Sequence, residues 1–494
     1  MDAVNTPAKR VNPSSVSVSI RMYRQGLGDC FLLTFPTSDP KRSFYMLIDC
    51  GVVMGHKKER NGIVSPSFKQ LADDIKKTTG GTIDLLVVTH EHYDHVIGFG
   101  NADANAVFRT MKVKDVWFAW TENPDDPDAT GLKERLKKTS NALRMAIGNA
   151  SPEAMQPIAS VLDFMGAADG KVGGTAGAMN AVRALLKQGK PKYLDPGKLD
   201  APLTLPNVPG VRIYVLGPPR NPARIKDLDP NIGQAYMTSE PPVALQGTLT
   251  QSRAFLLAAQ HACGANLSVD EKELLSLSFP FNENLRIPHE KAVKDPFFKT
   301  HYFDSPRETW RRIDDEWLGV GEELALQLDN YTNNTSLALA VELTNSGKVL
   351  ILAADAQVGN WLSWGDLEWT LKDGTSGKKI KVGDLLKRTA LYKVGHHGSS
   401  NASLKPFVDQ MSSPDLVSML SVDTQDAHSV GWANMPWTRL LKQLSGQGAN
   451  NRRVIIQMDQ YPTKKPAGMK DADWKAFQAR FQENELYMQY TVDG

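Results

Sequence analysis

The chain has 494 residues, of which 41% are apolar and 23% are charged, as in an ordinary soluble globular protein. The net charge of 57 − 55 = +2 excludes the broad positive field of a non-specific nucleic-acid binder, but it does not exclude a local basic groove. No run of 18 apolar residues occurs and the N-terminal segment lacks an apolar signal core, so we expect no membrane span and a cytoplasmic location. The three cysteines form no CxxC pair and indicate no disulfide framework.

The apolar pattern predicts strands near both ends of the chain. Three short strands with tight turns are expected first, at 16–24, 30–35 and 44–49, followed by a helix at 68–77 and a buried strand at 83–89. Later strands are expected at 113–119, 211–216, 337–343, 348–353, 390–394, 416–422, 453–458 and 486–492, and later helices at 131–148, 176–188, 306–328, 437–444 and 471–481. Strands from both halves predict a layered α/β or α+β domain.

The strand at 83–89 ends in a dense cluster of metal-ligand side chains. His90, His92, Asp94 and His95 form the string His-x-His-x-Asp-His, although the whole chain has only ten histidines. Imidazole suits zinc and related metals, and a carboxylate compensates the metal charge. Extended backbone places His90 and His92 on one side, and a following turn moves the other two side chains to a neighbouring position. The loop can therefore supply ligands to two metals.

Two further strand ends carry side chains of the same kind. Asp355 follows the apolar strand at 348–353, where it either bridges two metals or caps the next turn. His396 and His397 follow the strand at 390–394 between two glycines, which indicate a tight loop that is either a metal loop or a polar surface loop.

Taken together, these strings resemble the metallo-β-lactamase fold hydrolases. Asp49 matches the structural first motif, and the His90–His95 string matches the metal-binding second motif. Asp355 matches the bridging aspartate, and the His396–His397 pair contains the last histidine. Within the superfamily the chain is most similar to the ComEC competence-protein branch, through the Gly-Leu-Gly-Asp turn that ends at Asp29 and through two further strings, Asn334-Thr335-Ser336 and His396–Ser399.

This resemblance implies a four-layer αββα sandwich with a dinuclear site at the sheet edge and a large mid-chain insertion. It implies that His90 and His92 bind metal 1, that Asp94 and His95 bind metal 2, and that Asp355 bridges them. We expect His396 rather than His397 to complete metal 2. Zn²⁺ suits the imidazoles best and Mn²⁺ also fits the carboxylates.

The chain departs from the wider superfamily at the third ligand of metal 1. The candidates in the insertion, His261, His289 and His301, have no recognisable motif around them. Near the C-terminal end the branch commonly has a His-Pro, where this chain has Met435-Pro436, with His428 close by.

By the same resemblance, the expected chemistry is attack of a metal-bound hydroxide on a phosphodiester, in a nucleic acid or a small molecule. Asp94 or His397 would manage protons. Four other side chains are candidates for substrate contact: Lys393, Ser399, Ser400 and Asn334. Two alternatives stay open, namely a hydrolase of a lactone, thioester or β-lactam whose apolar pocket includes Trp361, Trp364 and Trp369, and a non-catalytic metal-stabilised scaffold or sensor.

The domain organisation follows from where these motifs lie. We expect a flexible tail at 1–14 and one catalytic domain made of two halves, 15–100 and 331–494. Residues 101–330 are expected to hold some sandwich elements and an insertion or lid. The oligomeric state is left open.

Overall fold

The computed structural model describes residues 17–53, 59–60, 62–147, 174–227, 230, 234–236, 285, 287–304, 328–372, 377–429, 432, 435–446, 453–458, 465 and 468–494. The predicted tail, residues 306–327 of the predicted helix at 306–328, and His261 lie outside these residues. The chain divides into two compact units, which comprise Met1–Thr130, Asp169–Glu240 and Asn330–Gly494 in the first and Gly131–Ala168 and Pro241–Asp329 in the second. No helix in the described part of the chain has the length and apolarity needed to cross a bilayer.

Two large sheets form the centre of the first unit. The eight-stranded sheet has the spatial order β10 (Lys192–Leu194), β9 (Val116–Ala119), β7 (Leu85–Val87), β3 (Ser43–Ile48), β2 (Phe31–Pro36), β1 (Val18–Tyr23), β20 (Tyr487–Val492) and β19 (Phe481–Glu483). The six-stranded sheet has the order β11 (Val211–Val215), β12 (Leu339–Leu343), β13 (Lys348–Leu352), β16 (Thr389–Lys393), β17 (Val417–Leu420) and β18 (Arg453–Ile456). The two-stranded pairs are β4 (Glu59–Arg60) with β5 (Ile63–Val64), β6 (Thr82–Ile83) with β8 (Lys112–Val113), and β14 (Glu368–Thr370) with β15 (Lys379–Lys381).

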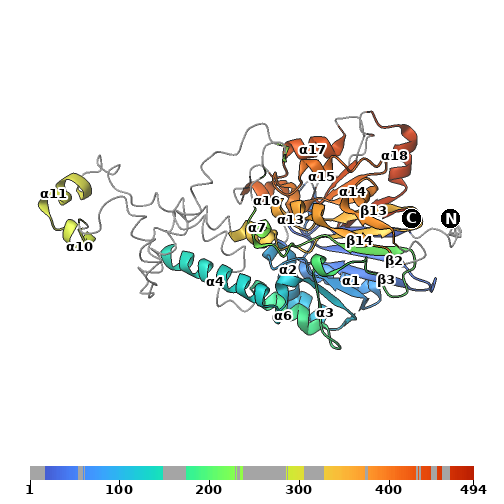
Figure 1. The fold of residues 1–494 in the computed structure, drawn as a ribbon, viewed down its shortest axis with the longest axis horizontal. Helices are drawn as coiled ribbons and strands as arrows, with labels where there is room; N and C mark the ends of the chain where they lie inside the picture. Colours follow the sequence, from blue (N-terminus) through green and yellow to red (C-terminus); the bar gives the residue numbers. More distant parts are fainter. Residues whose placement is uncertain are drawn as a thin grey trace. The chain divides into compact units, whose positions relative to one another are not determined.

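Helices cover the outer faces of both sheets (Figure 1). The helices in the first half are α1 (Phe68–Thr79), α2 (Tyr93–Gly100), α3 (Ala102–Phe108), α4 (Pro127–Ile147), α6 (Thr175–Leu185) and α7 (Pro222–Ile225). Those in the second half are α10 (His289–Ala292), α11 (Pro296–Phe298), α13 (Val358–Ser363), α14 (Val382–Leu386), α15 (Lys405–Val408), α16 (Thr424–Ser429), α17 (Thr438–Ser445) and α18 (Asp471–Gln478).

Three apolar cores lie between the layers of the first unit and pack them together. One core joins the facing sides of the two sheets, with Val87 from β7 and Leu350 from β13 among its members. A second core packs the six-stranded sheet against α13, α14 and α17, and a third packs the eight-stranded sheet against α1, α2 and α6. Alternate side chains of a strand point to opposite faces, so central strands such as β7 and β13 contribute to two cores. This is the predicted αββα sandwich, and the fold prediction is confirmed.

Both ends of the chain enter the same sheet. β20 pairs antiparallel with β1 from Val18–Val492 to Tyr23–Tyr487, although more than 460 residues separate the partners. The first three strands form the predicted antiparallel meander, and β12 and β13 form the predicted hairpin.

The parallel strands bring their carboxyl ends to one edge of the sandwich. β3, β7 and β9 are parallel in one sheet, and β13, β16 and β17 are parallel in the other. The residues that directly follow β3, β7 and β13 include Asp49, His90 and Asp355. The sheet topology therefore gathers the predicted ligands, which come from opposite ends of the sequence.

Candidate metal centre

The histidine string spans a transition from strand to helix. His92 is extended, with φ −106° and ψ 156°, and α2 begins at the next residue. Asp94 and His95 therefore lie in the first turn of a helix, whereas His90 and His92 precede it. Helical rather than extended backbone turns the last two side chains away from the first two, and this change of direction was expected from a turn.

Close backbone packing holds this segment in place. Cys50 N–H donates to the carbonyl of His95 over 2.7 Å, and Asp29 N–H donates to the carbonyl of Asp94 over 2.9 Å. A Cβ on Gly51 would lie 2.1 Å from the carbonyl carbon of Asp94, so only glycine fits there. The two predicted structural motifs, at Asp29 and Asp49, thus pack against the backbone of the metal loop.

Four fully buried side chains converge beside this loop: Asp94, His95, Asp355 and His397. His397 Nε2 lies 2.6 Å from Asp94 Oδ2 and 3.6 Å from Asp355 Oδ2, and His95 Nε2 lies 3.1 Å from Asp355 Oδ2. His90 lies against them, with its ring centre 4.2 Å from that of His95, and His90 Nε2 lies 3.1 Å from His92 Nδ1. The structure thus brings together six predicted site residues, with His397 where His396 was expected.

The hydrogen bonds on the outer side of the rings orient the inner nitrogens. His95 Nδ1 lies 2.8 Å from Asp49 Oδ2, and His397 Nδ1 lies 2.6 Å from the carbonyl of Ser421. Each partner is an acceptor, so Nδ1 carries the proton and Nε2 points into the cluster, as in proteins whose metal-binding histidines are fixed by an outer acceptor. Three atoms at the centre make no hydrogen bond of normal geometry: Asp94 Oδ1, His95 Nε2 and Asp355 Oδ2.

Charges within the cluster divide its histidines into two groups. Burial lowers the pKa of His92 and of His396 to about 4, and it lowers the pKa of His90 well below its usual range. Burial acts in the same direction on His95 and His397, but Asp355 and Asp94 outweigh it and raise the pKa of both imidazoles. The metal-free cluster therefore favours the protonated form of these two histidines.

The pKa values of the two carboxylates in the cluster, Asp94 and Asp355, are lowered. Burial favours the neutral form of Asp355, but His95, His397 and Lys393 outweigh burial and hold its pKa well below the usual range. The pKa of Asp94 is lowered in the same way, chiefly by His95 and His397. Ionised carboxylates beside cationic imidazoles mark a site that is built to receive positive charge.

The loop after β16 places His397, and not the expected His396, beside the carboxylates of the cluster. Both His396 and His397 have left-handed backbone, with φ 41° and 52°, and their ring centres lie 5.9 Å apart. His397 reaches the cluster, whereas His396 Nδ1 lies 2.9 Å from Ser399 Oγ and 3.1 Å from Gln357 Nε2. Two consecutive left-handed residues send the rings in different directions, and sequence spacing alone does not show which one turns inward.

Two of the expected substrate contacts are buried in the protein instead. The Asn334 side chain is fully buried and donates to the carbonyls of Ile225 and Asp227. Lys393 is also buried, and its ammonium pairs with Asp29 and Asp355. Both polar groups are already satisfied inside the fold, so neither is available to a substrate.

The remaining candidates fall into three groups. Ser399 is only 9% exposed and supports His396, whereas Ser400 is partly exposed beside it. His428 is exposed on α16. His289 and His301 belong to the second unit, whereas every residue of the cluster belongs to the first.

The three tryptophans after Asp355 are core residues. Trp361, Trp364 and Trp369 are all 1% exposed or less. The indole N–H of Trp361 donates to the carbonyls of Ala356 and Ala402. They do not line an open apolar pocket, which removes the sequence argument for a carbonyl substrate.

Two supporting residues were missed by the sequence analysis. Thr89 donates through its backbone N–H and its hydroxyl to the carboxylate of Asp49, which also orients His95. Ser421 accepts from His397 through its carbonyl and donates to Asp29 through its hydroxyl. Each lies one or two residues beyond a strand that ends at the site, which is the signal that would have found it.

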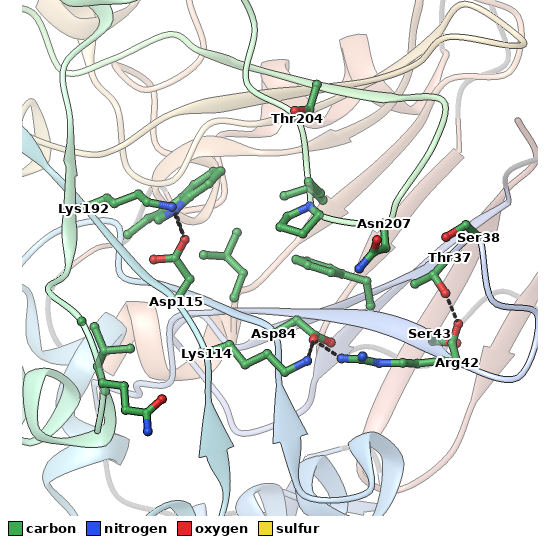
Figure 2. A pocket seen from close by; sticks show the side chains of 18 of the residues that line it. Thr37, Ser38, Arg42, Ser43, Asp84, Lys114, Asp115, Lys192, Thr204 and Asn207 are labelled. Atoms are coloured by element: carbon green, nitrogen blue, oxygen red, sulfur yellow. Dashed lines mark hydrogen bonds and ion pairs between the residues drawn. The ribbon is translucent and has the colours of Figure 1, made fainter.

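A surface hollow lies at the end of β7 opposite to the cluster, beside Asp84 and Leu85. It has a volume of about 670 Å³ and is lined by residues such as Arg42, Asp84 and Lys114 (Figure 2). Asp84 forms ion pairs with both Arg42 (2.7 Å) and Lys114 (2.6 Å), so one carboxylate is shared by two cations and the three side chains keep a net charge of +1. Asp84 and His90 stand at opposite ends of β7, about 20 Å apart at 3.3 Å per residue, so this hollow does not serve the cluster.

Residues 25–192 match the family model of the metallo-beta-lactamase superfamily. This segment is therefore similar to the superfamily, whose members are generally hydrolases that bind divalent metals. The matched segment includes the His90–His95 string, while Asp355 and His397 join it through the fold. No curated protein shows a significant match to the chain.

Proposed function

We propose that the chain is a dinuclear metal-dependent hydrolase that cleaves phosphodiesters. The observation that carries the proposal is the buried convergence of Asp94, His95, Asp355 and His397. At its centre Asp94 Oδ1 makes no hydrogen bond, and His95 Nε2 and Asp355 Oδ2 face each other at 3.1 Å without a hydrogen bond of normal geometry. Buried polar atoms are costly unless they are paired, and divalent metals would satisfy all three.

The donor set fits two metals. Asp94, His95 and His397 would hold one, His90 and His92 would hold the other, and Asp355 would lie between them. The mixture of imidazole and carboxylate suits Zn²⁺, and Mn²⁺ is the second choice. When bound, such metals would lower the pKa of a water molecule toward neutrality and neutralise the charge that develops on the phosphate.

The protein's own side chains orient the ligands and accept protons. Asp49 and the Ser421 carbonyl hold the rings of His95 and His397 by their outer nitrogens. His397 then has one nitrogen left, which can hold a metal or a proton but not both, and we assign it to the metal. Asp94 has two oxygens, so one can bind a metal while the other accepts a proton from the attacking water.

The choice of a phosphodiester is supported by the similarity to the ComEC branch in three strings: Gly26–Asp29, Asn334–Ser336 and His396–Ser399. The net charge of +2 is compatible with a nucleic acid held at a local groove and with a small phosphodiester.

A panel of three substrates tests this proposal: bis(p-nitrophenyl) phosphate, a lactone and nitrocefin. The zinc- or manganese-loaded protein is expected to cleave the first fastest. Asp355→Asn, which keeps the shape of the side chain, should abolish turnover, while the control His428→Ala on an exposed helix should not. Carbonyl turnover without phosphodiester turnover would replace the substrate class. Metal-loaded protein that cleaves nothing would favour a scaffold or sensor.

A further inference from the structure

Lys393 is a buried lysine next to the cluster, and all its N–H donors have acceptors. The side chain of Lys393 is 4% exposed, and its ammonium faces three acceptors. These are Asp29 Oδ2 at 2.5 Å, the carbonyl of Ala354 at 3.0 Å and Asp355 Oδ1 at 3.4 Å. An ammonium has exactly as many protons as this set has acceptors, so Lys393 is fixed in place.

Asp29 is itself anchored by groups other than Lys393. Its N–H donates to the carbonyl of Asp94 over 2.9 Å, and its carbonyl accepts from Gly51 N–H over 3.0 Å. Its second carboxylate oxygen accepts from the hydroxyl of Ser421. The position of Asp29 therefore does not depend on the lysine, and the carboxylate acts as a rigid holder for the ammonium.

The two oxygens of Asp355 have different surroundings. Oδ1 receives the ammonium of Lys393 and the backbone N–H of His396, which lies at 3.2 Å. Oδ2 faces His95 Nε2 at 3.1 Å and makes no hydrogen bond of normal geometry. The lysine side of the carboxylate is occupied, and only the cluster side is available.

We propose that the Lys393–Asp29 pair is a built-in counter-charge that positions the bridging carboxylate and limits the metal affinity of the site. This inference rests on the proposed function, because it assumes that Asp355 holds metal. Lys393 keeps Oδ1 of Asp355 occupied, so that Oδ2 alone is presented to the metals. Asp29 in turn neutralises most of the lysine charge.

The same arrangement accounts for a second group of potential ligands. Asp29, Asp49 and His95 also lie close enough together to hold a cation. The ammonium of Lys393 already supplies positive charge to Asp29 there, and His95 supplies it to Asp49. No third metal is needed to balance these carboxylates.

Removing the charge of Lys393 makes the surroundings of the metals more negative, whereas removing the charge of Asp29 makes them more positive. Lys393→Met removes a positive charge beside the metals, so zinc should bind more tightly, by roughly tenfold or more at this distance. Asp29→Asn keeps the amide oxygen as an acceptor for Ser421 but leaves the lysine charge uncompensated, so zinc should bind more weakly by a similar factor. A merely structural role predicts weaker binding in both variants.

The experiment is a zinc titration of metal-free full-length protein against a chromophoric chelator. Four forms are compared with the wild type: the two single variants, the double variant Lys393→Met/Asp29→Asn, and the control Lys114→Met. The control removes a lysine that pairs with the buried Asp84 at the far end of β7, so its zinc affinity should equal that of the wild type. The double variant should lie between the two single variants.

The outcomes separate this inference from the proposed function. If Lys393→Met does not fold because Asp29 is left buried and unpaired, the double variant must still bind zinc more tightly than Asp29→Asn. Equal weakening in all three site variants, with normal wild-type binding, overturns the counter-charge and leaves the proposed function standing. Wild-type protein that binds no zinc or manganese overturns both.

Discussion

Metal binding to this cluster should release about two protons near neutral pH. In the metal-free site burial lowers the pKa values of His95 and His397, but Asp355 and Asp94 outweigh burial and raise them, so both rings hold a proton to higher pH than a free imidazole does. The pKa values of His92 and His396 fall to about 4 and that of His90 falls well below its usual range, so these rings release nothing. A metal takes the place of each displaced proton.

The magnitude follows from the number of protons displaced. Each proton lost on binding changes the apparent metal affinity by about tenfold per pH unit, so two protons give roughly a hundredfold change per unit below the pKa values. Isothermal titration calorimetry with Zn²⁺, in buffers of different ionisation enthalpy at one pH, measures the proton count directly. Tight binding of zinc at pH 7 with no proton release would refute the assigned protonation states.

The same pKa shifts fix how the stability of the metal-free protein depends on pH. A raised histidine pKa contributes stability that is complete below the ordinary value of 6.5 and is lost as pH rises through the raised value. The lowered pKa values of Asp94 and Asp355 contribute stability that is complete above 3.8 and is lost as pH falls through the lowered values. The lowered pKa values of His90, His92 and His396 act against folding in acid, because below pH 6.5 the unfolded chain takes up protons on these rings and the folded protein does not. Thermal unfolding of metal-free protein should therefore give the highest Tm near pH 6.5 and a lower Tm on either side.

Three substitutions test the supporting structure. Asp49→Asn should weaken zinc binding by about 10–100-fold because it loosens the ring of His95, and unchanged affinity in the chelator titration would contradict that role. Gly51→Ala should displace the metal loop and reduce metal retained after dialysis, whereas the control Gly177→Ala, which meets no atom within 4 Å, should retain it. Trp361→Ala should lower the free energy of unfolding by about 3–5 kcal/mol in a denaturant titration, and a loss under 1 kcal/mol would argue against a close-packed core there.

Local sequence predicted the strand ends and the first ligand loop well, because both depend on short-range patterns. The apolar run before His90 predicts a buried strand, and the His-x-His-x-Asp-His spacing predicts ligands at its end. The glycine and aspartate turn at Asp29 marked a structural motif, which the structure places under the metal loop.

The surroundings of other site residues could not be predicted from the sequence, because they depend on long-range packing. The choice between His396 and His397 is made by two left-handed backbone angles and by the carbonyl of Ser421, which is 24 residues away. The role of Lys393 depends on Asp29, more than 360 residues earlier in the chain. Neither partner can be identified from the residues next to it.

The most direct test of the metal centre is a crystal structure of the metal-loaded protein with anomalous data collected above and below the metal edge. Two peaks about 3.5–4 Å apart are expected. One peak should contact Asp94, His95 and His397, the other should contact His90 and His92, and Asp355 should touch both. A metal bound by His396 in place of His397 would contradict the ligand assignment. The absence of any peak between Asp94 and Asp355 in protein reconstituted with zinc or manganese would contradict the proposal of a dinuclear hydrolase.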